Sequence, residues 1–425
     1  MIYRISKRDK TLKGTISLTP SKSISNRVLM ISAFCTAPFQ IFNLATANDT
    51  VVFKNILNSD SEIVNAEDAG TAFRFLTAYL AQKPGKWLLT GTARMKQRPV
   101  GILVNVLRKL GAEISFTEME NFPPLKIIGK KLKGGTIELD GNVSSQFTSA
   151  LLMIAPTLED GLKIKINGEL FSKPYVEMTL KLMNQFGIHS EWREDIISIA
   201  QQEYQPTTIT IENDWSAASY WYEMAALAED VDLTIEGLKQ NSIQGDSAIA
   251  EIMNQFGVET EFTNEGIRLT KNASSKYSSP SPHPSPFTQH PSKTFTHNFQ
   301  SHPDLVQTMA VICAALGIDG AFSGVQNLRI KETDRLKALQ TELKKIGVLS
   351  EITNNEYRIT NFEQLHPSPL TFHTYNDHRM AMSFAPLALK WGKVEIENPD
   401  VVKKSYPEFW EDLKSVGFDI DFKTS

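Results

Sequence analysis

A short segment that recurs along this chain constrains its fold more than any other feature. Leu182–Ile188 and Ile252–Val258 both have the pattern apolar, Met, Asn, Gln, Phe, Gly, apolar, and looser copies occupy residues 107–112, 343–348 and 413–418. Each copy combines the end of an amphipathic helix, a glycine and a short strand-like run. A chance match of helix-ending words becomes improbable when five copies are present, so the chain is predicted to repeat one α/β unit.

Length and composition define the class of protein. A chain of 425 residues is too long for one ordinary core and predicts two domains. The formal net charge of −4 argues against a general nucleic-acid or membrane surface. Two cysteines, Cys35 and Cys313, offer neither a disulfide framework nor a zinc spacing. Because we find no signal-like N-terminus and no membrane-spanning apolar run, we expect a cytoplasmic protein.

Residues 272–297 interrupt the repeat pattern. They are rich in Ser, Pro and His and poor in aliphatic residues, so they are expected to form an exposed, mobile insertion. His283, His290 and His297 follow one another at regular spacing within it. A metal site is the alternative reading, but no acidic or Cys partner stands nearby in the sequence, and a solvated loop is favoured.

Two charged runs, residues 327–335 and 375–382, each lead into an apolar segment. They combine Arg and Lys with carboxylates or an imidazole, the groups that can hold an anion and move protons around it. Either run alone would be read as a solvated helix start with local salt bridges.

Hydroxyl and cationic residues gather at further expected helix starts, in residues 20–27, 67–74, 94–99, 142–147 and 172–175. Helix N-termini attract anions through free N–H groups and the helix dipole. The glycines and Gly-Lys-Ser/Thr ending of a nucleotide P-loop are missing. Each segment alone is ordinary turn chemistry. Together they predict a small substrate with several negative charges and hydroxyl groups.

In their order along the chain, these motifs resemble those of the 5-enolpyruvylshikimate-3-phosphate (EPSP) synthase family. The similarity spans almost the whole chain, and the runs Lys331–Arg335 and Asn376–Met382 are its most specific parts. It implies a two-domain inverted α/β barrel-like fold, with each domain built from βαβαββ repeats around a pseudo-threefold axis. The N-terminal domain is expected at 21–213 and the C-terminal domain at 1–20 plus 214–425.

The resemblance also implies an activity. Enzymes of this family transfer the enolpyruvyl group of phosphoenolpyruvate to the 5-hydroxyl of shikimate 3-phosphate and release phosphate. They proceed by addition and elimination in the shikimate pathway, which leads to chorismate and the aromatic amino acids. The resemblance implies no metal or organic cofactor, a monomer, substrates bound between two closing domains, and glyphosate as an inhibitor at the phosphoenolpyruvate site.

The site residues are carried over by position. The expected phosphoenolpyruvate contacts are Lys22, Gly70, Arg98, Gln146, Arg335, Arg379 and Lys404. The expected shikimate 3-phosphate contacts are Lys22, Ser23, Arg27, Ser144, Ser145, Gln146, Ser172, Tyr175, Asp304, Asn327 and Lys331. The expected catalytic residues are Asp304, Glu332, Lys22 and His378. Asp304 matches the base, and Glu332 matches the acid, with Lys404 or His378 assisting. Surrounding cations would lower the pKa of an acidic carboxyl unless burial offset them.

Three departures from the family pattern and two alternatives remain. The insertion at residues 272–297 is one departure, and it is remote in sequence from the motifs. Asp68 stands where the family more often has Asn, and its charge would repel phosphoenolpyruvate unless a cation such as Arg74 neutralised it. The chain is also short between residues 49 and 68, so the first repeat is expected to be abbreviated. One alternative is a UDP-N-acetylglucosamine enolpyruvyl transferase, although that family relies on a Cys in a mobile loop. The other is a non-catalytic phosphate-binding relative, which would lack the acid and base groups.

Overall fold

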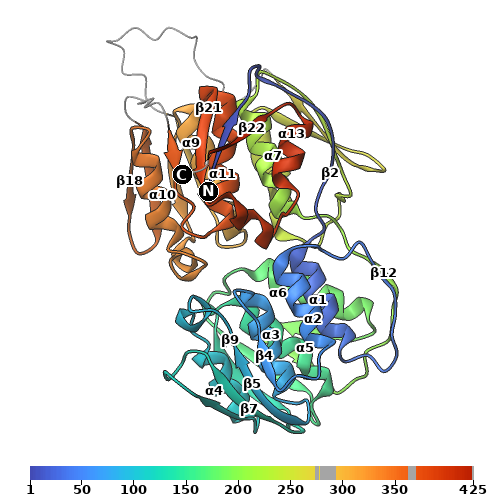
Figure 1. The fold of residues 1–425 in the computed structure, drawn as a ribbon. Coiled ribbons are helices and arrows are strands. Elements are labelled where there is room, and N and C mark those ends of the chain that lie inside the picture. Colours follow the sequence, from blue (N-terminus) through green and yellow to red (C-terminus); the bar gives the residue numbers. More distant parts are fainter. Residues whose placement is uncertain (273–276, 278–292, 362–369, 424–425) are drawn as a thin grey trace. The chain divides into compact units, whose positions relative to one another are not determined.

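The computed structural model describes residues 1–272, 277, 293–361 and 370–423. The chain divides into two compact units, which are Met1–Thr19 with Glu212–Ser425, and Pro20–Ile211. We call them the larger and the smaller unit. Figure 1 shows that both are built of strands and helices in alternation. None of the helices in the described residues is long and apolar enough to cross a membrane.

The larger unit contains three four-stranded sheets, each made from one βαβαββ repeat. The first has the order β14-β15-β13-β2 and uses β2 (Thr11–Ser17), α7 (Trp215–Leu227), β13 (Asp230–Glu236), α8 (Ile249–Asn254), β14 (Val258–Phe262) and β15 (Gly266–Lys271). The second has the order β16-β17-β19-β18 and uses β16 (Thr294–Asn298), α9 (Val306–Leu316), β17 (Asp319–Ser323), α10 (Arg335–Lys344), β18 (Val348–Ile352) and β19 (Glu356–Asn361). In both, the first two strands pair in parallel and the last two form an antiparallel hairpin.

The third sheet of the larger unit is completed by the N-terminus of the chain. Its order is β20-β21-β1-β22, and it uses β20 (Thr371–Phe372), α11 (His378–Phe384), β21 (Lys393–Glu397), α13 (Phe409–Ser415), β22 (Asp419–Lys423) and β1 (Ile2–Ser6). Short helices join these elements: η3 (Gly245–Ala248), η4 (Pro303–Leu305), η5 (Gln326–Ile330), η6 (Ala385–Leu387), α12 (Ala388–Trp391) and η7 (Pro399–Lys404).

The smaller unit has two complete repeats and one reduced repeat. The sheet β4-β5-β7-β6 uses β4 (Ile63–Asn65), α3 (Gly70–Leu80), β5 (Gly85–Thr90), α4 (Gly101–Lys109), β6 (Glu113–Phe116) and β7 (Leu125–Gly129). The sheet β10-β11-β9-β8 uses β8 (Gly135–Asp140), α5 (Ser145–Ile154), β9 (Leu162–Asn167), α6 (Lys173–Gln185), β10 (Glu191–Arg193) and β11 (Ile196–Ile199). The reduced repeat has α1 (Lys22–Ser32), β3 (Ile41–Phe42), α2 (Asn48–Leu57) and β12 (Ile209–Thr210). Its two strands pair in parallel. Turns η1 (Met95–Gln97) and η2 (Ala155–Thr157) complete the unit.

The predicted helix ends are confirmed at all five repeated segments. Gly111, Gly187, Gly257, Gly347 and Gly417 each follow the second helix of a repeat and precede its next strand. Their φ angles lie between +77° and +98°, a left-handed conformation that is costly for residues with a Cβ. The two-domain α/β fold class predicted from the sequence is confirmed as well.

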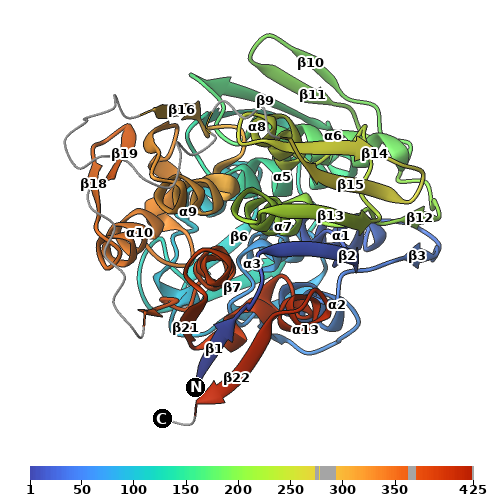
Figure 2. The same cartoon turned by 90° about the horizontal axis from the view of Figure 1, so that it is seen from above.

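Buried helices fill the centre of the larger unit. Almost every residue of α7, α9 and α11 is buried, and their apolar side chains, Trp221, Met309 and Phe384 among them, belong to one continuous core. Figure 2 shows the three sheets arranged around these helices. Each central helix follows the first strand of its repeat, so the loops before the three helices gather at one end of the core.

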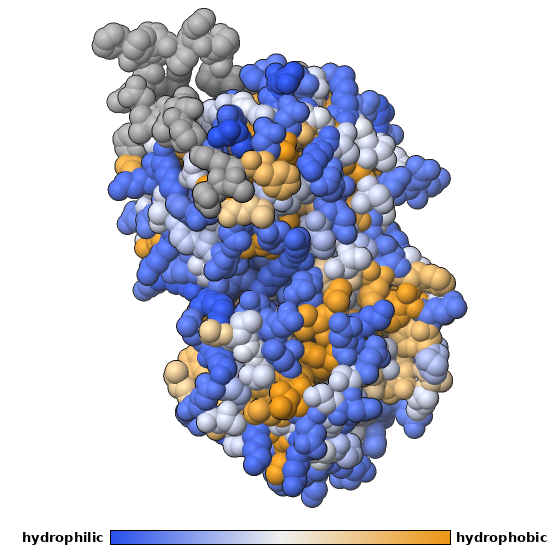
Figure 3. Space-filling model, in the orientation of Figure 1, coloured by the Kyte–Doolittle hydropathy of each residue, from blue (hydrophilic) through white to orange (hydrophobic). Residues whose placement is uncertain are grey.

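In the smaller unit, α1, α3 and α5 hold the corresponding places, and most of their residues are buried. On the face drawn in Figure 3, hydrophilic side chains cover most of the larger unit, whereas hydrophobic side chains gather on the smaller unit.

The expected insertion ends earlier than the composition indicated. Residues 294–297 form most of β16, because Phe295 is buried against Phe256 and Tyr277. Residues 273–276 and 278–292, with His283 and His290, lie outside the described residues. Within the described part of the chain, no group of three or more His, Cys, Asp or Glu is placed to hold a metal ion.

Candidate active site

The expected site residues lie mostly at the starts of helices. In the smaller unit, Ser21 caps α1 and Ser144 caps α5, because each hydroxyl accepts a hydrogen bond from an N–H of the first turn. In the larger unit, Asp214, Asp334 and Asp377 cap α7, α10 and α11 in the same way. Ser and Asp are favoured at helix starts because their side chains accept hydrogen bonds from the free N–H groups of the first turn.

Arg335 lies at the centre of a charged cluster in the larger unit. It is 1% exposed. Its Nε donates to Asp377 Oδ2 at 2.7 Å, Nη1 to Asp304 Oδ1 at 2.9 Å, and Nη2 to Glu332 Oε2 at 2.9 Å. One planar guanidinium therefore fixes three carboxylates that come from three different loops. The candidate base and the candidate acid share this arginine.

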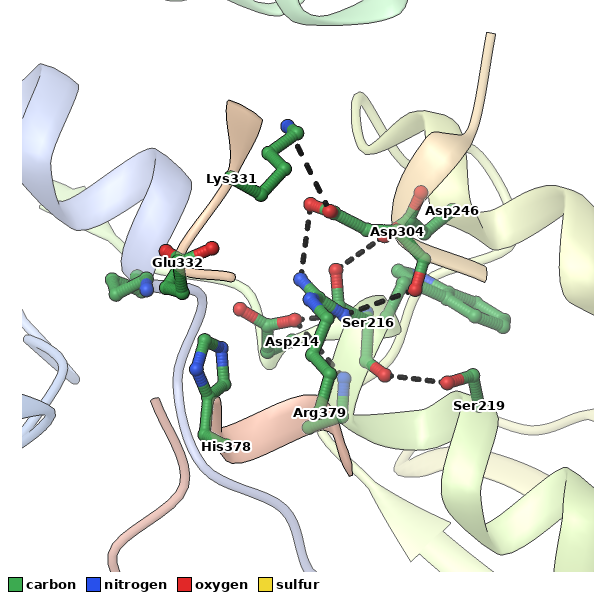
Figure 4. Close-up of polar contacts among 12 residues, drawn as sticks. Asp214, Ser216, Ser219, Asp246, Asp304, Lys331, Glu332, His378 and Arg379 are labelled. Atoms are coloured by element: carbon green, nitrogen blue, oxygen red, sulfur yellow. Dashed lines mark hydrogen bonds and ion pairs between the residues drawn. The ribbon is translucent and has the colours of Figure 1, made fainter. Parts of the chain in front are cut away.

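Three more cations lie near the same carboxylates, and Figure 4 shows two of them, Arg379 and Lys331, beside Asp304. Arg379 Nη2 lies 3.0 Å from Asp304 Oδ2, and Lys331 Nζ lies 4.0 Å from Asp304 Oδ1. Lys404 Nζ lies 3.7 Å from Glu332 Oε1. The cluster thus has almost balanced charges, and an anion that enters must compete with carboxylates for the cations.

The protonation of Asp304 follows from this arrangement. Burial alone would raise its pKa, but the charges of Arg379, Lys331 and Arg335 outweigh burial and hold the pKa far below its usual range. Asp304 is therefore ionised and a weak base while these cations remain on it. Burial also lowers the pKa of Lys331, and the charge of Asp304 opposes that shift.

His378 is the first residue of α11 and is buried. Its Nδ1 lies 3.6 Å from Asp377 Oδ1, the carboxylate that also binds Arg335. Arg379 follows it and donates through Nη1 to the main-chain carbonyl of Asp304 at 3.2 Å. The His–Arg pair at the start of α11 thus faces the same carboxylates.

Arg98 has a different environment in the smaller unit. It is 7% exposed, and among the described residues no carboxylate pairs with it and its Nε has no hydrogen-bond partner. Its guanidinium lies against Gly70, the first residue of α3, where an added Cβ would be 2.4 Å from Nη1. A buried cation beside the positive end of a helix is unfavourable unless an anion binds there.

Arg27 is engaged within the smaller unit. Its Nε donates to Thr179 Oγ1 at 2.7 Å, Nη1 to the carbonyl of Ser23 at 2.9 Å, and Nη2 to Ser149 Oγ at 3.1 Å. Burial lowers its pKa to about 10. These bonds tie the start of α1 to α5 and α6, so Arg27 orders the helix starts on which the expected shikimate 3-phosphate contacts lie.

The other expected residues of the smaller unit have these positions. Lys22 Nζ lies 3.2 Å from Asp49 Oδ2, and Gln146 Nε2 donates to Thr71 Oγ1 at 3.0 Å. Ser145 begins α5, and Ser172 precedes α6 in a left-handed conformation with a φ of +55°. Tyr175 lies in the first turn of α6.

The structure sorts the expected site residues between the two units. The smaller unit contains Lys22, Ser23, Arg27, Gly70, Arg98, Ser144, Ser145, Gln146, Ser172 and Tyr175. The larger unit contains Asp304, Asn327, Lys331, Glu332, Arg335, His378, Arg379 and Lys404. Arg74 is the cation expected to neutralise Asp68. In the structure Asp68 accepts a hydrogen bond from the Thr92 hydroxyl, and Arg74 Nη1 donates to the Gly70 carbonyl at 2.8 Å.

Sequence reasoning missed two carboxylates of the larger cluster. Asp377 stands directly before His378 and Arg379, but its bond to Arg335 joins residues 42 positions apart. Asp246 follows a Gly in the turn before α8 and lies among the same charges, which act on its pKa. An acidic residue just after a turn glycine is the only local signal that could have indicated Asp246.

Solved structures share this architecture. The chain aligns with an EPSP synthase from Acinetobacter baumannii at a TM-score of 0.78 and 20% identity, covering 99% of this chain and 100% of the other. It aligns with the enolpyruvyl transferase NikO from Streptomyces tendae at a TM-score of 0.74 and 15% identity, covering 100% and 99%. The fold is therefore that of an enolpyruvyl transferase.

Sequence comparison assigns the family within this class. The model of the EPSP synthase (3-phosphoshikimate 1-carboxyvinyltransferase) family matches residues 52–413. A 3-phosphoshikimate 1-carboxyvinyltransferase of Bacteroides fragilis is 45% identical over 96% of both chains. One of Vibrio campbellii is 35% identical over 95% of this chain and 97% of its own. The chain belongs to the EPSP synthase family.

Proposed function

We propose that this protein transfers the enolpyruvyl group of phosphoenolpyruvate to the 5-hydroxyl of shikimate 3-phosphate and releases phosphate. The observation that carries the proposal is that Asp304 and Glu332 share the guanidinium of Arg335. A candidate base, a candidate acid and an anion-binding cation are thus held together. A non-catalytic phosphate-binding relative would need the cation but neither the acid nor the base.

Phosphoenolpyruvate carries a phosphate and a carboxylate, and both need cations. In the smaller unit we assign it to Arg98, to the N-terminus of α3 at Gly70, and to Lys22 and Gln146. Arg98 has no carboxylate partner in the described part of the chain, and this buried charge supports the assignment. In the larger unit we assign it to Arg335, Arg379 and Lys404, which also neutralise charge as the phosphate leaves.

Shikimate 3-phosphate carries a phosphate, a carboxylate and ring hydroxyls. We assign it to the hydroxyl-rich helix starts of the smaller unit. Capping by Ser144 and the internal bonds of Arg27 keep these starts ordered, which supports the assignment. The assigned residues are Lys22, Ser23, Arg27, Ser144, Ser145, Gln146, Ser172 and Tyr175, with Asp304, Asn327 and Lys331 from the larger unit.

In the addition step, Asp304 takes the proton of the 5-hydroxyl while that oxygen bonds to C2 of phosphoenolpyruvate. Glu332, assisted by Lys404 or His378, gives a proton to the methylene carbon C3. The low pKa of Asp304 opposes this step as long as its cations stay in place. Substrate anions that draw Arg379 and Lys331 away would raise that pKa and make Asp304 an effective base.

In the elimination step, C3 loses a proton to Glu332 and the bond between C2 and the phosphate oxygen breaks. The electron pair of that bond leaves with the phosphate, which takes up the proton held by Asp304. The carboxyvinyl ether and inorganic phosphate are the products, and both carboxyl groups return to their starting states. Cations around the cluster stabilise the charge that develops on the leaving phosphate.

We also propose that the two compact units are the two domains of the family. The protein is further proposed to act as a cytoplasmic monomer that needs neither a metal nor an organic cofactor. Cys35 and Cys313 are unpaired, which supports a reducing compartment. Light scattering of the purified protein and turnover in the presence of EDTA test the monomer and the metal independence.

The test of the proposed function is phosphate release from purified protein given both substrates. Release must require phosphoenolpyruvate and shikimate 3-phosphate together, must not occur with UDP-N-acetylglucosamine as the acceptor, and must collapse in the Asp304→Ala variant. Release with the nucleotide sugar, or release that survives Asp304→Ala, would reject the assignment. Asp319→Asn, a change at the start of β17, serves as the matched control.

A further inference from the structure

Asp246 is a buried carboxyl in η3 that the reaction described above does not use. It is 3% exposed. The hydroxyl of Ser216, in the first turn of α7, donates a hydrogen bond to Oδ2. The other oxygen, Oδ1, is buried and has no hydrogen-bond partner among the described residues. A buried carboxyl with one oxygen lacking a hydrogen bond destabilises the folded state, so we expect a function that explains its position.

The charges around Asp246 connect it to the candidate base. Burial raises its pKa to about 7, the charge of Asp304 raises it as well, and that of Arg379 lowers it. The Ser216 hydrogen bond lowers it and the charge of Asp214 raises it. Figure 4 shows Asp246 next to Asp304, with Asp214 and Ser216 at the start of α7. Asp246 therefore belongs to the same electrostatic cluster as the candidate base.

Asp304 needs a group of this kind. Three cations make it a weak base, yet the proposed addition step requires it to accept a proton. A negative charge close by offsets part of their effect, because it stabilises the protonated form of Asp304 relative to the ionised form. It also attracts Arg379, which pairs with Asp304 and whose charge acts on Asp246.

We propose that Asp246 is a positioning residue whose negative charge keeps Asp304 basic enough to accept the proton of the attacking hydroxyl. This inference rests on the proposed function of Asp304. Asp246 does not touch the substrate in this account. It acts through Asp304 and Arg379, and Ser216 holds its carboxyl in place.

The sign of the pH dependence follows directly. Below the pKa of Asp246 its carboxyl is neutral and gives Asp304 no help, and above that pKa it is charged and raises the basicity of Asp304. The side chain of Asp246→Asn resembles the protonated acid at every pH. The ratio of wild-type to variant kcat/KM should therefore rise with pH through the neutral range.

The experiment measures kcat/KM for phosphoenolpyruvate from about pH 5.5 to about pH 8.5 in both proteins. The ratio of wild type to Asp246→Asn should be close to one at the acid end and about tenfold at the alkaline end, as expected for one pKa unit of Asp304 basicity. Both proteins share the titration of the substrates, so it cancels in the ratio. A ratio that does not change with pH would indicate a merely structural role and overturn the proposal.

Two further variants guard this reading. Ser216→Ala removes the hydrogen bond that favours the ionised form of Asp246. The increase of kcat/KM with pH should therefore occur at higher pH in this variant. This variant keeps Asp246 and covers the case in which Asp246→Asn does not fold. Asp412→Asn is the matched control, because burial also raises the pKa of Asp412, to about 6, while its carboxyl binds Tyr406. Its ratio to wild type should be independent of pH.

A second readout does not depend on turnover. In the ligand-free protein with carbon-13 in its Asp carboxyl groups, the signal lost in Asp246→Asn should titrate near neutral pH in the wild type. The same signal should titrate at lower pH in Asp304→Asn, because the repulsion between the two carboxylates is gone. If it does not move, the proposal fails whether or not the protein turns over. If it moves and the wild type does not turn over, the proposed function fails instead.

Discussion

Replacement of Gly70 by alanine should weaken binding of phosphoenolpyruvate without unfolding the protein. A Cβ at this position would lie 2.4 Å from Arg98 Nη1 and 2.8 Å from Cζ, closer than carbon and nitrogen can approach. The backbone of Gly70 is the start of α3, so the guanidinium is the part that must move, by about 1 Å, to restore an ordinary contact.

The expected magnitude follows from the interaction that is disturbed. A hydrogen bond to a charged group contributes about 1.5–3 kcal/mol, so the KM for phosphoenolpyruvate should rise roughly ten- to hundredfold. Stability should not fall, because alanine is favoured over glycine in a helix by about 1 kcal/mol. If glyphosate binds in the same place, its inhibition constant should rise in parallel.

The assay is phosphate release with phosphoenolpyruvate varied at saturating shikimate 3-phosphate, together with a thermal melt. Gly101→Ala is the matched control. Gly101 also begins a helix of the smaller unit, α4, but its added Cβ would meet the neutral side chain of Asn121 at 2.1 Å. An unchanged KM in Gly70→Ala, or an equal rise in both variants, would refute the assignment of Arg98 and Gly70 to phosphoenolpyruvate.

Three other changes have defined outcomes. Arg98→Met should raise the Tm of the ligand-free protein, since it removes a buried cation that has no carboxylate partner among the described residues. The KM for phosphoenolpyruvate should rise in the same variant, and a lower Tm would contradict the reasoning. Asp377→Asn should lower both kcat and the free energy of unfolding, the latter by about 1.5–3 kcal/mol, because it weakens one of the three carboxylate contacts of buried Arg335. Urea unfolding measures the change, and an unaltered midpoint would count against it. Burial and the neighbouring His297 lower the pKa of His302 to about 4, below its value in the unfolded chain. The free energy of unfolding should therefore fall as the pH drops from about 6.5 through 4, and it should fall less steeply in His302→Phe. Melts at several pH values measure this, and equal slopes of Tm against pH in the two proteins would disprove it.

The sequence predicted most of what local chemistry controls. Serine and aspartate at helix starts and glycine at helix ends have conformational preferences that act within a few residues, so the repeat and the helix starts could be read directly. The resemblance added the roles of Asp304 and Glu332. Their common bond to Arg335 is consistent with those roles and leaves them to be tested.

What the sequence could not predict depends on distant contacts. Asp377 meets Arg335 across 42 positions, and Asp246 meets Ser216 across 30. No local pattern encodes either contact, because the first joins the helix starts of two different repeats and the second joins two helix starts on either side of β13. The same holds for residues 294–297, whose polar composition hid Phe295 from the compositional argument.

The most direct test of the central claim is the reaction carried out in deuterium oxide and followed by proton NMR. Addition and elimination create a methyl group at C3 for a moment, so the vinyl group of the product should contain deuterium while one phosphate is released for each product formed. Glu332→Gln should form the deuterated product much more slowly, because it lacks the group that protonates C3. A wild-type product with no deuterium at C3, or phosphate released without a vinyl product, would contradict the account.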